Sequence, residues 1–219
     1  MPTKLKRALH AIFPRSTTTI ILMNILLFVT SLYSGEFNRI IVMHQYVSSD
    51  PNLVDMIVSI FLHGSWSHLI GNMIILYVMG IVLEHKLGST WFTFSYFITG
   101  FAGAIMFSFM SDYPQGAIGA SGAIYGLMGI FVGMFPLYEK FKKHWLDWTV
   151  EIFLLILVLW SFHFTLMAGL NEPLLPIRSG VANWAHVGGF AMGVLLGIGT
   201  ELIHSIHRNH PEKPHADNN

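Results

Sequence analysis

Cysteine is absent from this chain of 219 residues, and charged side chains make up only 11% of it. The lack of cysteine excludes disulfide bonds, thiolate nucleophiles and cysteine metal ligands. A soluble domain usually carries about a quarter charged residues, whereas here hydrophobic residues account for 53% of the chain. The composition therefore indicates an integral membrane protein.

Six apolar runs are long enough to cross a hydrocarbon core about 30 Å thick. They are Thr17–Tyr33, Trp66–Leu83, Thr90–Met110, Ile118–Leu137, Val150–Ala168 and Val181–Ile203. They lack the alternation of apolar and polar residues that marks the strands of a membrane barrel. Because backbone polar groups in lipid must be satisfied within a segment, we expect each run to be one helix. The predicted fold class is an all-α membrane protein, a six-transmembrane-helix bundle.

Lysine and arginine are divided unevenly between the two sides of such a bundle. If the N-terminus is cytoplasmic, only Arg39 and Arg178 lie outside. The inner residues are then Lys4, Lys6, Arg7, Arg15, Lys86, Lys140, Lys142, Lys143, Arg208 and Lys213. This positive-inside bias predicts that both termini are cytoplasmic. We expect the first run to be retained as a helix, because no convincing signal-peptide cleavage site follows it.

The chain organisation predicts a single membrane domain. Residues 1–16 form a basic cytoplasmic N-terminus, residues 17–203 the six-span domain, and residues 204–219 a polar tail that we expect to be disordered. The longest loop, residues 34–65, mixes charged and apolar pieces, which favours a position in the membrane interface. We expect the protein in a plasma or inner membrane.

Glycines recur every three or four residues in two of the runs. They are Gly122, Gly126, Gly129 and Gly133 in the fourth run, and Gly189, Gly193 and Gly197 in the sixth. Such stripes let two helix backbones approach closely in lipid. Because each stripe begins beside a polar residue, close packing of these two helices would bring Ser121 and His186 together.

A few polar side chains interrupt the outer ends of the runs. Ser121 begins the fourth span, and Tyr125 lies on the same helix face four residues later. His186 lies in the sixth span, while His68 and Asn72 share a face of the second. Taken singly, each is ordinarily a hydrogen-bonding group between or within helices. Their convergence at one depth of the bilayer favours a functional site.

These groups suffice for acyl transfer. The Ser121 hydroxyl becomes a nucleophile when a neighbouring base takes its proton, and His186 could serve as that base. His68 and Asn72, with the backbone N–H of Ser121, could donate hydrogen bonds to the oxyanion of a tetrahedral intermediate. The sequence therefore predicts a serine hydrolase site on the outer side of the membrane.

An acid that would orient His186 is not evident. Glu201 stands about 22 Å further along the same helix, and Glu151 lies near the cytoplasmic end of the fifth span. Asp112, in an outer loop, stays open as a partner. We therefore expect a serine–histidine dyad in which Tyr125 positions the imidazole.

Three segments taken together resemble the signature of rhomboid intramembrane serine proteases: "HGSWSHLIGN", "GASGAIYGLMG" and "AHVGGFAMG". The resemblance implies a six-helix bundle that cleaves other membrane proteins in or beside their transmembrane segments. It implies that Ser121 is the nucleophile, His186 the base, His68 and Asn72 the oxyanion donors, and Tyr125 the imidazole-packing residue. Structural roles follow for His63, Gly119, Gly122, Gly189 and Gly193.

The resemblance also bears on partners. The expected partners are single- or multi-span membrane proteins and the bilayer, with no cofactor, no metal and no nucleic acid. A substrate helix would have to unwind before Ser121 could reach it, so helix-weakening residues and a small side chain at the cut are implied. The glycine- and proline-containing loop 111–120 is a candidate to bind substrate backbone.

One departure from the family pattern lies in the first outer loop. Many relatives carry a Trp-Arg pair about nine residues before the first histidine, where this chain has "NLVDMIVSI". The pair takes no part in the chemistry, so the predicted dyad stands. The seating of the loop in the membrane and the shape of the substrate entrance stay open.

Two other classes of function compete. A catalytically silent rhomboid-like protein that binds membrane clients would be expected to lose the serine or the base, and this chain keeps both. A transporter could use His68, His163 and His186 as a proton path, but it leaves the Gly-x-Ser-Gly motif unexplained. For His163 itself we expect a hydrogen bond between helices.

Overall fold

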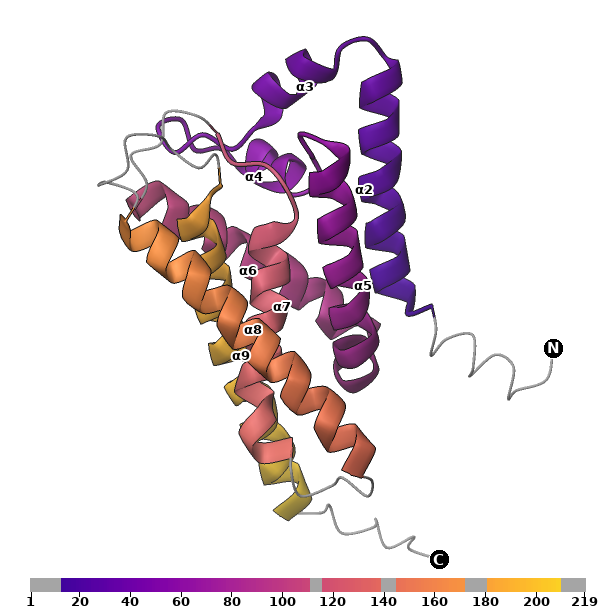
Figure 1. Ribbon diagram of the computed structural model, residues 1–219, viewed down its shortest axis with the longest axis vertical. Helices are drawn as coiled ribbons and strands as arrows, with labels where there is room; N and C mark the ends of the chain where they lie inside the picture. The colour runs from indigo at the N-terminus through magenta and orange to yellow at the C-terminus, as the bar shows by residue number, and fades with distance from the viewer. Residues whose placement is uncertain (1–12, 111–115, 139–144, 172–180, 210–219) are drawn as a thin grey trace, which may run out of the picture.

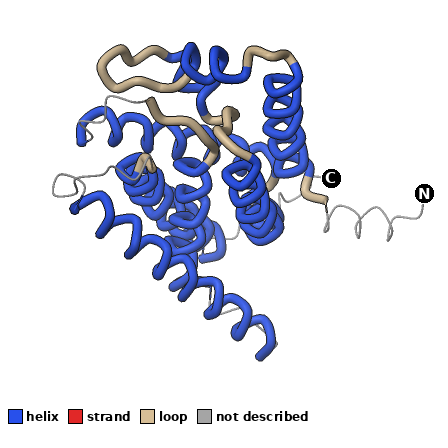
Figure 2. The backbone as a smooth tube through the Cα atoms, turned by 45° about the horizontal axis from the view of Figure 1, so that its top comes forward, coloured by secondary structure: helices blue, strands red, loops and turns tan. Residues whose placement is uncertain are grey.

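The chain folds as a bundle of long helices, and the computed structural model describes residues 13–110, 116–138, 145–171 and 181–209. The long helices are α2 (Arg15–Tyr33), α5 (Trp66–Leu87), α6 (Ser89–Met110), α7 (Ser121–Tyr138), α8 (Trp145–Asn171) and α9 (Asn183–Asn209). Two short helices, α3 (Phe37–His44) and α4 (Leu53–Ser59), lie together at one end of the bundle (Figure 1). Within the described ranges, β pairing is limited to one isolated bridge, and Figure 2 shows no strand. The predicted all-α fold class is confirmed.

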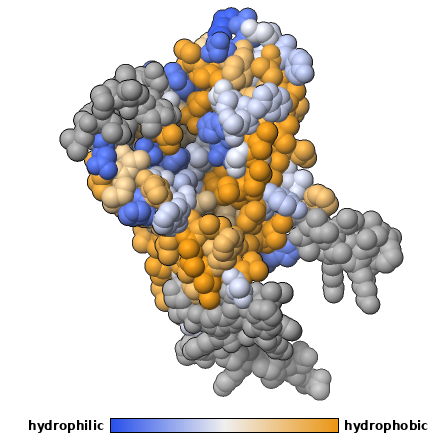
Figure 3. Space-filling model, viewed as in Figure 1, coloured by the Kyte–Doolittle hydropathy of each residue, from blue (hydrophilic) through white to orange (hydrophobic). Residues whose placement is uncertain are grey.

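Five helices, α2, α5, α6, α8 and α9, are long and apolar enough to cross a membrane. Helix α7 carries a shorter apolar stretch, Ser121–Phe135, most of which is buried among its neighbours. Large hydrophobic side chains are exposed on the other long helices, and Figure 3 shows them covering much of the flank of the bundle. The protein is therefore a multi-pass membrane protein. The count of six spans and the side on which the termini lie stay predictions.

The predicted runs coincide with the long helices, with differences at their ends. The fourth run was expected to begin at Ile118, but helix α7 begins at Ser121. Gly119 has φ +112°, which no α-helix contains, so the preceding residues form an irregular turn. Helix α9 continues to Asn209, six residues past the predicted end of its run and into the predicted tail.

The first outer loop is more ordered than its sequence suggested, because it contains both short helices. Exposed apolar side chains stand on each, with Val42 65% exposed on α3 and Leu53 64% exposed on α4. Asn52 caps α4 by accepting a hydrogen bond from the backbone N–H of Asp55. Exposed apolar side chains at this end of the bundle support the predicted interfacial position of the loop.

Helices α7 and α9 pack backbone to backbone through their glycines. A Cβ placed on Gly189 would strike the carbonyl oxygen of Gly122, and one on Gly193 would strike the carbonyl oxygen of Gly126. The relation is mutual, because a Cβ on Gly129 would strike the carbonyl oxygen of Phe190. The predicted close packing is confirmed, and it fixes the separation of α7 and α9 by main-chain contact.

A buried carboxylate joins three helices at the opposite end of the bundle from α3 and α4. Glu84 is only 4% exposed, near the end of α5. It accepts hydrogen bonds from the backbone N–H groups of Ser16 and Thr17, both at 2.8 Å, and from the Thr17 hydroxyl at 2.7 Å. The Ser89 hydroxyl, at the start of α6, donates a fourth at 2.6 Å. Glu84 thus satisfies free amides at the N-terminus of α2, where a negative charge is favoured.

Candidate active site

Ser121 is the first residue of α7, and the segment before it is held by main-chain hydrogen bonds. Tyr46 and Ala117 exchange two of them, at 3.0 and 2.8 Å, which form the isolated bridge. The N–H of Gly119 donates to the carbonyl of Ser59 at 2.8 Å. Because the first amides of a helix have no partner within it, Ser121 stands beside free N–H donors at the positive end of the helix dipole.

His186 lies in the first turn of α9 and faces Ser121. Its Nε2 is 2.7 Å from the Ser121 hydroxyl oxygen, across 65 residues of sequence. The imidazole is only 7% exposed. If Nε2 accepts the hydroxyl proton, Nδ1 carries the ring proton. The pair is therefore placed for proton transfer from the hydroxyl to the ring.

The far side of the His186 ring carries no acid in the part of the chain that the structure describes. Nδ1 of His186 is buried there without a hydrogen-bond partner. Glu151 pairs with Lys86 at 3.7 Å, and Glu201 lies about four turns further along α9. Asp112, which the sequence left open as a partner, falls outside the described residues. The geometry within these ranges is that of a pair of residues rather than of a triad.

Tyr125 lies against the imidazole from one turn further along α7. The two rings are stacked, with centroids 4.5 Å apart and planes only 7° from parallel. The Tyr125 hydroxyl is hydrogen-bonded to the hydroxyls of Ser161, at 2.7 Å, and Thr165, at 2.8 Å. Both partners belong to α8, so Tyr125 bridges α8 and the His186 ring.

His68 and Asn72 approach the same place from α5. A Cβ on Gly119 would lie 2.8 Å from two ring atoms of His68 and 3.4 Å from the amide nitrogen of Asn72. Both side chains therefore lie against the backbone two residues before Ser121. The helix start that presents them is capped by Ser65, whose hydroxyl accepts the His68 N–H at 3.2 Å.

His63 precedes α5 and fixes the orientation of the Asn72 amide. The Nδ1–H of His63 donates to the carbonyl of Phe61 at 3.3 Å, so Nε2 must accept, and it accepts from the Asn72 amide nitrogen at 3.0 Å. His63 is 1% exposed. Burial, helped by the nearby His68, lowers the pKa of His63 to about 4, although the bond to Phe61 opposes the shift. His63 thus stays neutral near pH 7 and keeps its acceptor.

A small cavity of about 40 Å³ adjoins Ser121. Glycine and alanine supply much of its wall, together with Tyr46, Met56 and Ser59 from the first outer loop. It holds a few water molecules at most, or one small side chain. Among the described residues, no group of three or more histidine, aspartate and glutamate side chains is placed to hold a metal ion.

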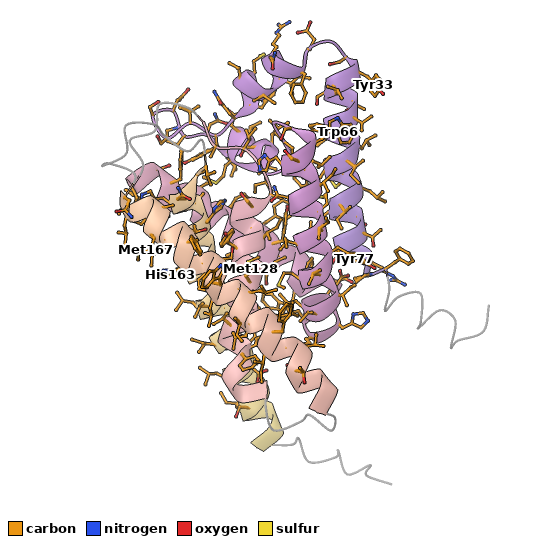
Figure 4. The ribbon with its side chains drawn as sticks, in the orientation of Figure 1. Tyr33, Trp66, Tyr77, Met128, His163 and Met167 are labelled. Carbon is orange, nitrogen blue, oxygen red and sulfur yellow. The ribbon has the colours of Figure 1, made fainter. Side chains whose placement is uncertain are left out.

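Two residues at the site were missed from the sequence, Ser161 and Thr165. Their spacing of four residues, which places two hydroxyls on one face of an apolar helix, was the available signal. His163, between them, lies on a different face and is exposed, as Figure 4 shows for α8. Its ring contacts Phe164, with centroids 6.0 Å apart. Within the described residues the predicted hydrogen bond of His163 to another helix is not formed.

Comparison with known proteins gives a consistent picture. A family model described as the Rhomboid domain matches residues 50–201. "RHOMBOID-like protein 4" of Arabidopsis thaliana is 36% identical over 137 residues, which is 63% of this chain and 31% of that protein. "RHOMBOID-like protein 6, mitochondrial" of the same plant is 33% identical over 142 residues, or 65% of this chain and 42% of that protein.

A relative from the fungus Emericella nidulans bears a name that states an activity. "Rhomboid-type serine protease 2" is 26% identical over 142 residues, which is 65% of this chain and 26% of that protein. The chain thus spans well under half of the length of each of these three relatives.

Proposed function

The chain belongs to the rhomboid family, and on that premise we propose that it is an intramembrane serine endopeptidase that cleaves transmembrane segments of other membrane proteins. The observation that carries the proposal is the 2.7 Å approach of His186 Nε2 to the Ser121 hydroxyl, with the imidazole stacked on Tyr125. A merely structural serine in a membrane helix bonds to its own backbone or to another helix, and neither role requires an imidazole that is itself stacked on an aromatic ring.

The chemistry follows from this geometry. Ser121 Oγ attacks the scissile carbonyl while Nε2 of His186 takes the hydroxyl proton, and the carbonyl oxygen becomes an oxyanion. The N–H of Ser121 and the side chains of His68 and Asn72 donate hydrogen bonds to it, each donor being worth about 3–4 kcal/mol. The protonated imidazole then gives its proton to the leaving amine, and water resolves the acyl-enzyme by the same route in reverse.

The stack with Tyr125 serves the charged intermediate. Once His186 has taken the proton it is a cation lying on an aromatic face, an arrangement that favours the charged form by about 0.5–2 kcal/mol. With no acid on Nδ1 within the described residues, this aromatic face takes part of the role that a carboxylate has in a triad.

The substrate class follows from the surroundings of Ser121. A helical segment has its carbonyls engaged in hydrogen bonds, so it must unwind locally before the serine can attack. The cavity beside Ser121, about 40 Å³ in volume, suits a small side chain at the cleavage site. The positive-inside distribution of basic residues favours an extracytoplasmic position for this end of the bundle, and the membrane we propose is a plasma or inner membrane.

The test is cleavage of a single-span substrate by purified protein in detergent, compared with Ser121→Ala. We expect cleavage by the first and none by the second. Labelling by a serine-directed fluorophosphonate gives a readout independent of substrate choice, because only an activated Ser121 reacts. Cleavage with labelling confirms the protease.

A catalytically silent, client-binding protein is the alternative. Most of the relatives carry the name rhomboid-like, without a stated activity. That alternative predicts neither cleavage nor labelling of Ser121, while a single-span client still binds. Equal cleavage by the wild type and by Ser121→Ala would contradict the assignment of the nucleophile.

A further inference from the structure

We propose that Ser161 and Thr165 of α8 are positioning residues for the reaction, acting on His186 through the Tyr125 hydroxyl. The inference rests on the proposed function and extends it to α8, a helix that supplies no group to the reacting atoms. The observation that carries it is the chain of contacts from two α8 hydroxyls to one phenol, whose ring is stacked on the imidazole.

The Tyr125 hydroxyl is hydrogen-bonded to both α8 hydroxyls. A phenol has one proton to donate and lone pairs to accept with, so Tyr125 donates to one α8 hydroxyl and accepts from the other. Thr165 is only 7% exposed, and its Oγ1 is 2.8 Å from the phenol oxygen. Two partners on adjacent turns of one helix fix the phenol oxygen in position, where a single partner would leave it free to swing.

The two hydrogen bonds hold the far end of the Tyr125 ring while its face lies against His186. The stack is nearly parallel, at 7°, with the ring centroids 4.5 Å apart. A phenylalanine ring would keep the apolar contact but lose the anchor at its far end. The hydroxyl anchor therefore sets where the aromatic face lies, and the imidazole follows that face.

Helix α8 is the part of the bundle best suited to move. Only 17% of its span is buried, against 28 to 44% for the other four long apolar helices. Large side chains such as Trp160, 64% exposed, and Phe164, 57% exposed, point away from the bundle. On its inner side, Phe162 stacks on Phe190 of α9 with centroids 3.9 Å apart.

The consequence is a link between α8 and catalysis. When α8 keeps its position, the phenol is held at both hydroxyls and the imidazole stays 2.7 Å from Ser121. When α8 shifts, the hydrogen bonds to the Tyr125 hydroxyl break and the Tyr125 ring is no longer held against His186. Loss of the contacts then lowers the rate of the chemical step rather than the binding of substrate.

Thr165→Val tests the inference, because valine keeps the shape and removes the hydroxyl. We expect the kcat of Thr165→Val to fall about five-fold, with KM within about two-fold of the wild type. Thr165→Ser restores the hydroxyl and should restore kcat. Thr30→Val is the matched control, since the Thr30 hydroxyl donates to carbonyls of its own helix. It should leave kcat unchanged.

A double-mutant cycle decides whether the effect passes through the phenol. In a Tyr125→Phe background, Thr165→Val should change kcat by less than about 1.5-fold, because the contact is already lost. An undiminished five-fold fall in that background, or a wild-type kcat for Thr165→Val alone, overturns the inference. If Thr165→Val is unfolded in a thermal melt, Ser161→Ala replaces it in the same cycle, with the same two overturning results.

Failure of the proposed function gives a different pattern. In that case the wild type itself neither cleaves substrate nor reacts with fluorophosphonate at Ser121, which overturns the proposed function and this inference with it. If the wild type reacts while Thr165→Val reacts equally fast, the protease stands and the role of α8 does not.

Discussion

The Glu84 carboxylate, at one end of α5, accepts four hydrogen bonds. His186 lies near the level of the other end of α5, and within the described part of the chain it has one hydrogen bond on Nε2 and none on Nδ1. Glu84 joins α2, α5 and α6 by accepting hydrogen bonds from Ser16, Thr17 and Ser89. The polar groups around Ser121 keep donors and acceptors in reserve, beside a small cavity. The Glu84 end therefore serves stability, while the Ser121 end keeps unused hydrogen-bonding capacity, which the proposed function assigns to a substrate.

The largest expected effect separates the two ends through activity. His186→Ala should lower cleavage at least about a thousandfold, because Ser121 loses its base. Its unfolding temperature in detergent should fall less than that of Glu84→Ala, because within the described residues the ring makes one side-chain hydrogen bond against the four of Glu84. A large loss of stability with retained cleavage would reverse the comparison.

The next effect separates the ends through stability. Glu84→Ala leaves four donors without their acceptor, and we expect it to lower the free energy of unfolding by about 3 kcal/mol. Cleavage per folded molecule should stay within about two-fold of the wild type. Thermal melts measure the loss of stability, and active-site titration with fluorophosphonate counts the folded molecules for the cleavage rate. Glu84→Asp keeps the charge and should lose less stability than Glu84→Ala.

A pair of glycines sharpens the comparison within the outer end. Gly119→Ala is strained at φ +112°, and its new methyl group would lie 2.8 Å from His68 ring atoms. We expect kcat to fall about twenty-fold. Gly122→Ala places its methyl group 3.5 Å from the carbonyl oxygen of Ala185, an ordinary van der Waals contact. The kcat of Gly122→Ala should fall by less than about three-fold. Equal losses of kcat in the two variants would contradict the account of Gly119.

The smallest effect is a dependence of stability on pH. The folded pKa of His63 is about 4, against 6.5 in the unfolded chain, so the unfolded state binds more protons between these values. Stability is therefore lost as the pH falls through that window, by about 1 kcal/mol between pH 7 and 5.5. In thermal melts, His63→Gln should lose about that much less stability than the wild type between pH 7 and 5.5. Identical pH profiles of the two proteins would contradict the lowered pKa of His63.

The sequence predicted the arrangement of the long helices because hydropathy and glycine spacing act over whole segments. The stripe from Gly189 correctly predicted the backbone contact with α7. The ends of the helices were harder to predict. The start of α7 at Ser121 depends on the positive φ of Gly119, and a hydropathy pattern carries no information on backbone angles. The helices of the first outer loop were likewise too short for an apolar run to reveal.

Individual polar contacts were predictable only where two signals agreed. Ser121, His186 and Tyr125 stand near a glycine stripe, so their proximity could be inferred. The contact of Tyr125 with Ser161 and Thr165 depends on how α8 is rotated about its own axis. The four-residue spacing of the two hydroxyls shows that they share a face of α8, but it does not show which helix that face contacts. His63 could be placed in a structural role, but the direction of its hydrogen bond to Asn72 required coordinates.

The main-chain contact between α7 and α9 also bears on when the molecule acquires its activity. Ser121 is synthesised 65 residues before His186, and only the docking of α9 on the glycines of α7 brings the two side chains together. A nascent chain that has inserted α7 alone carries a serine with no base. Under the proposed function, the site is completed only when α9, the last long helix that the structure describes, docks on α7. A chain that is still being assembled would then have no activity toward its neighbours or itself.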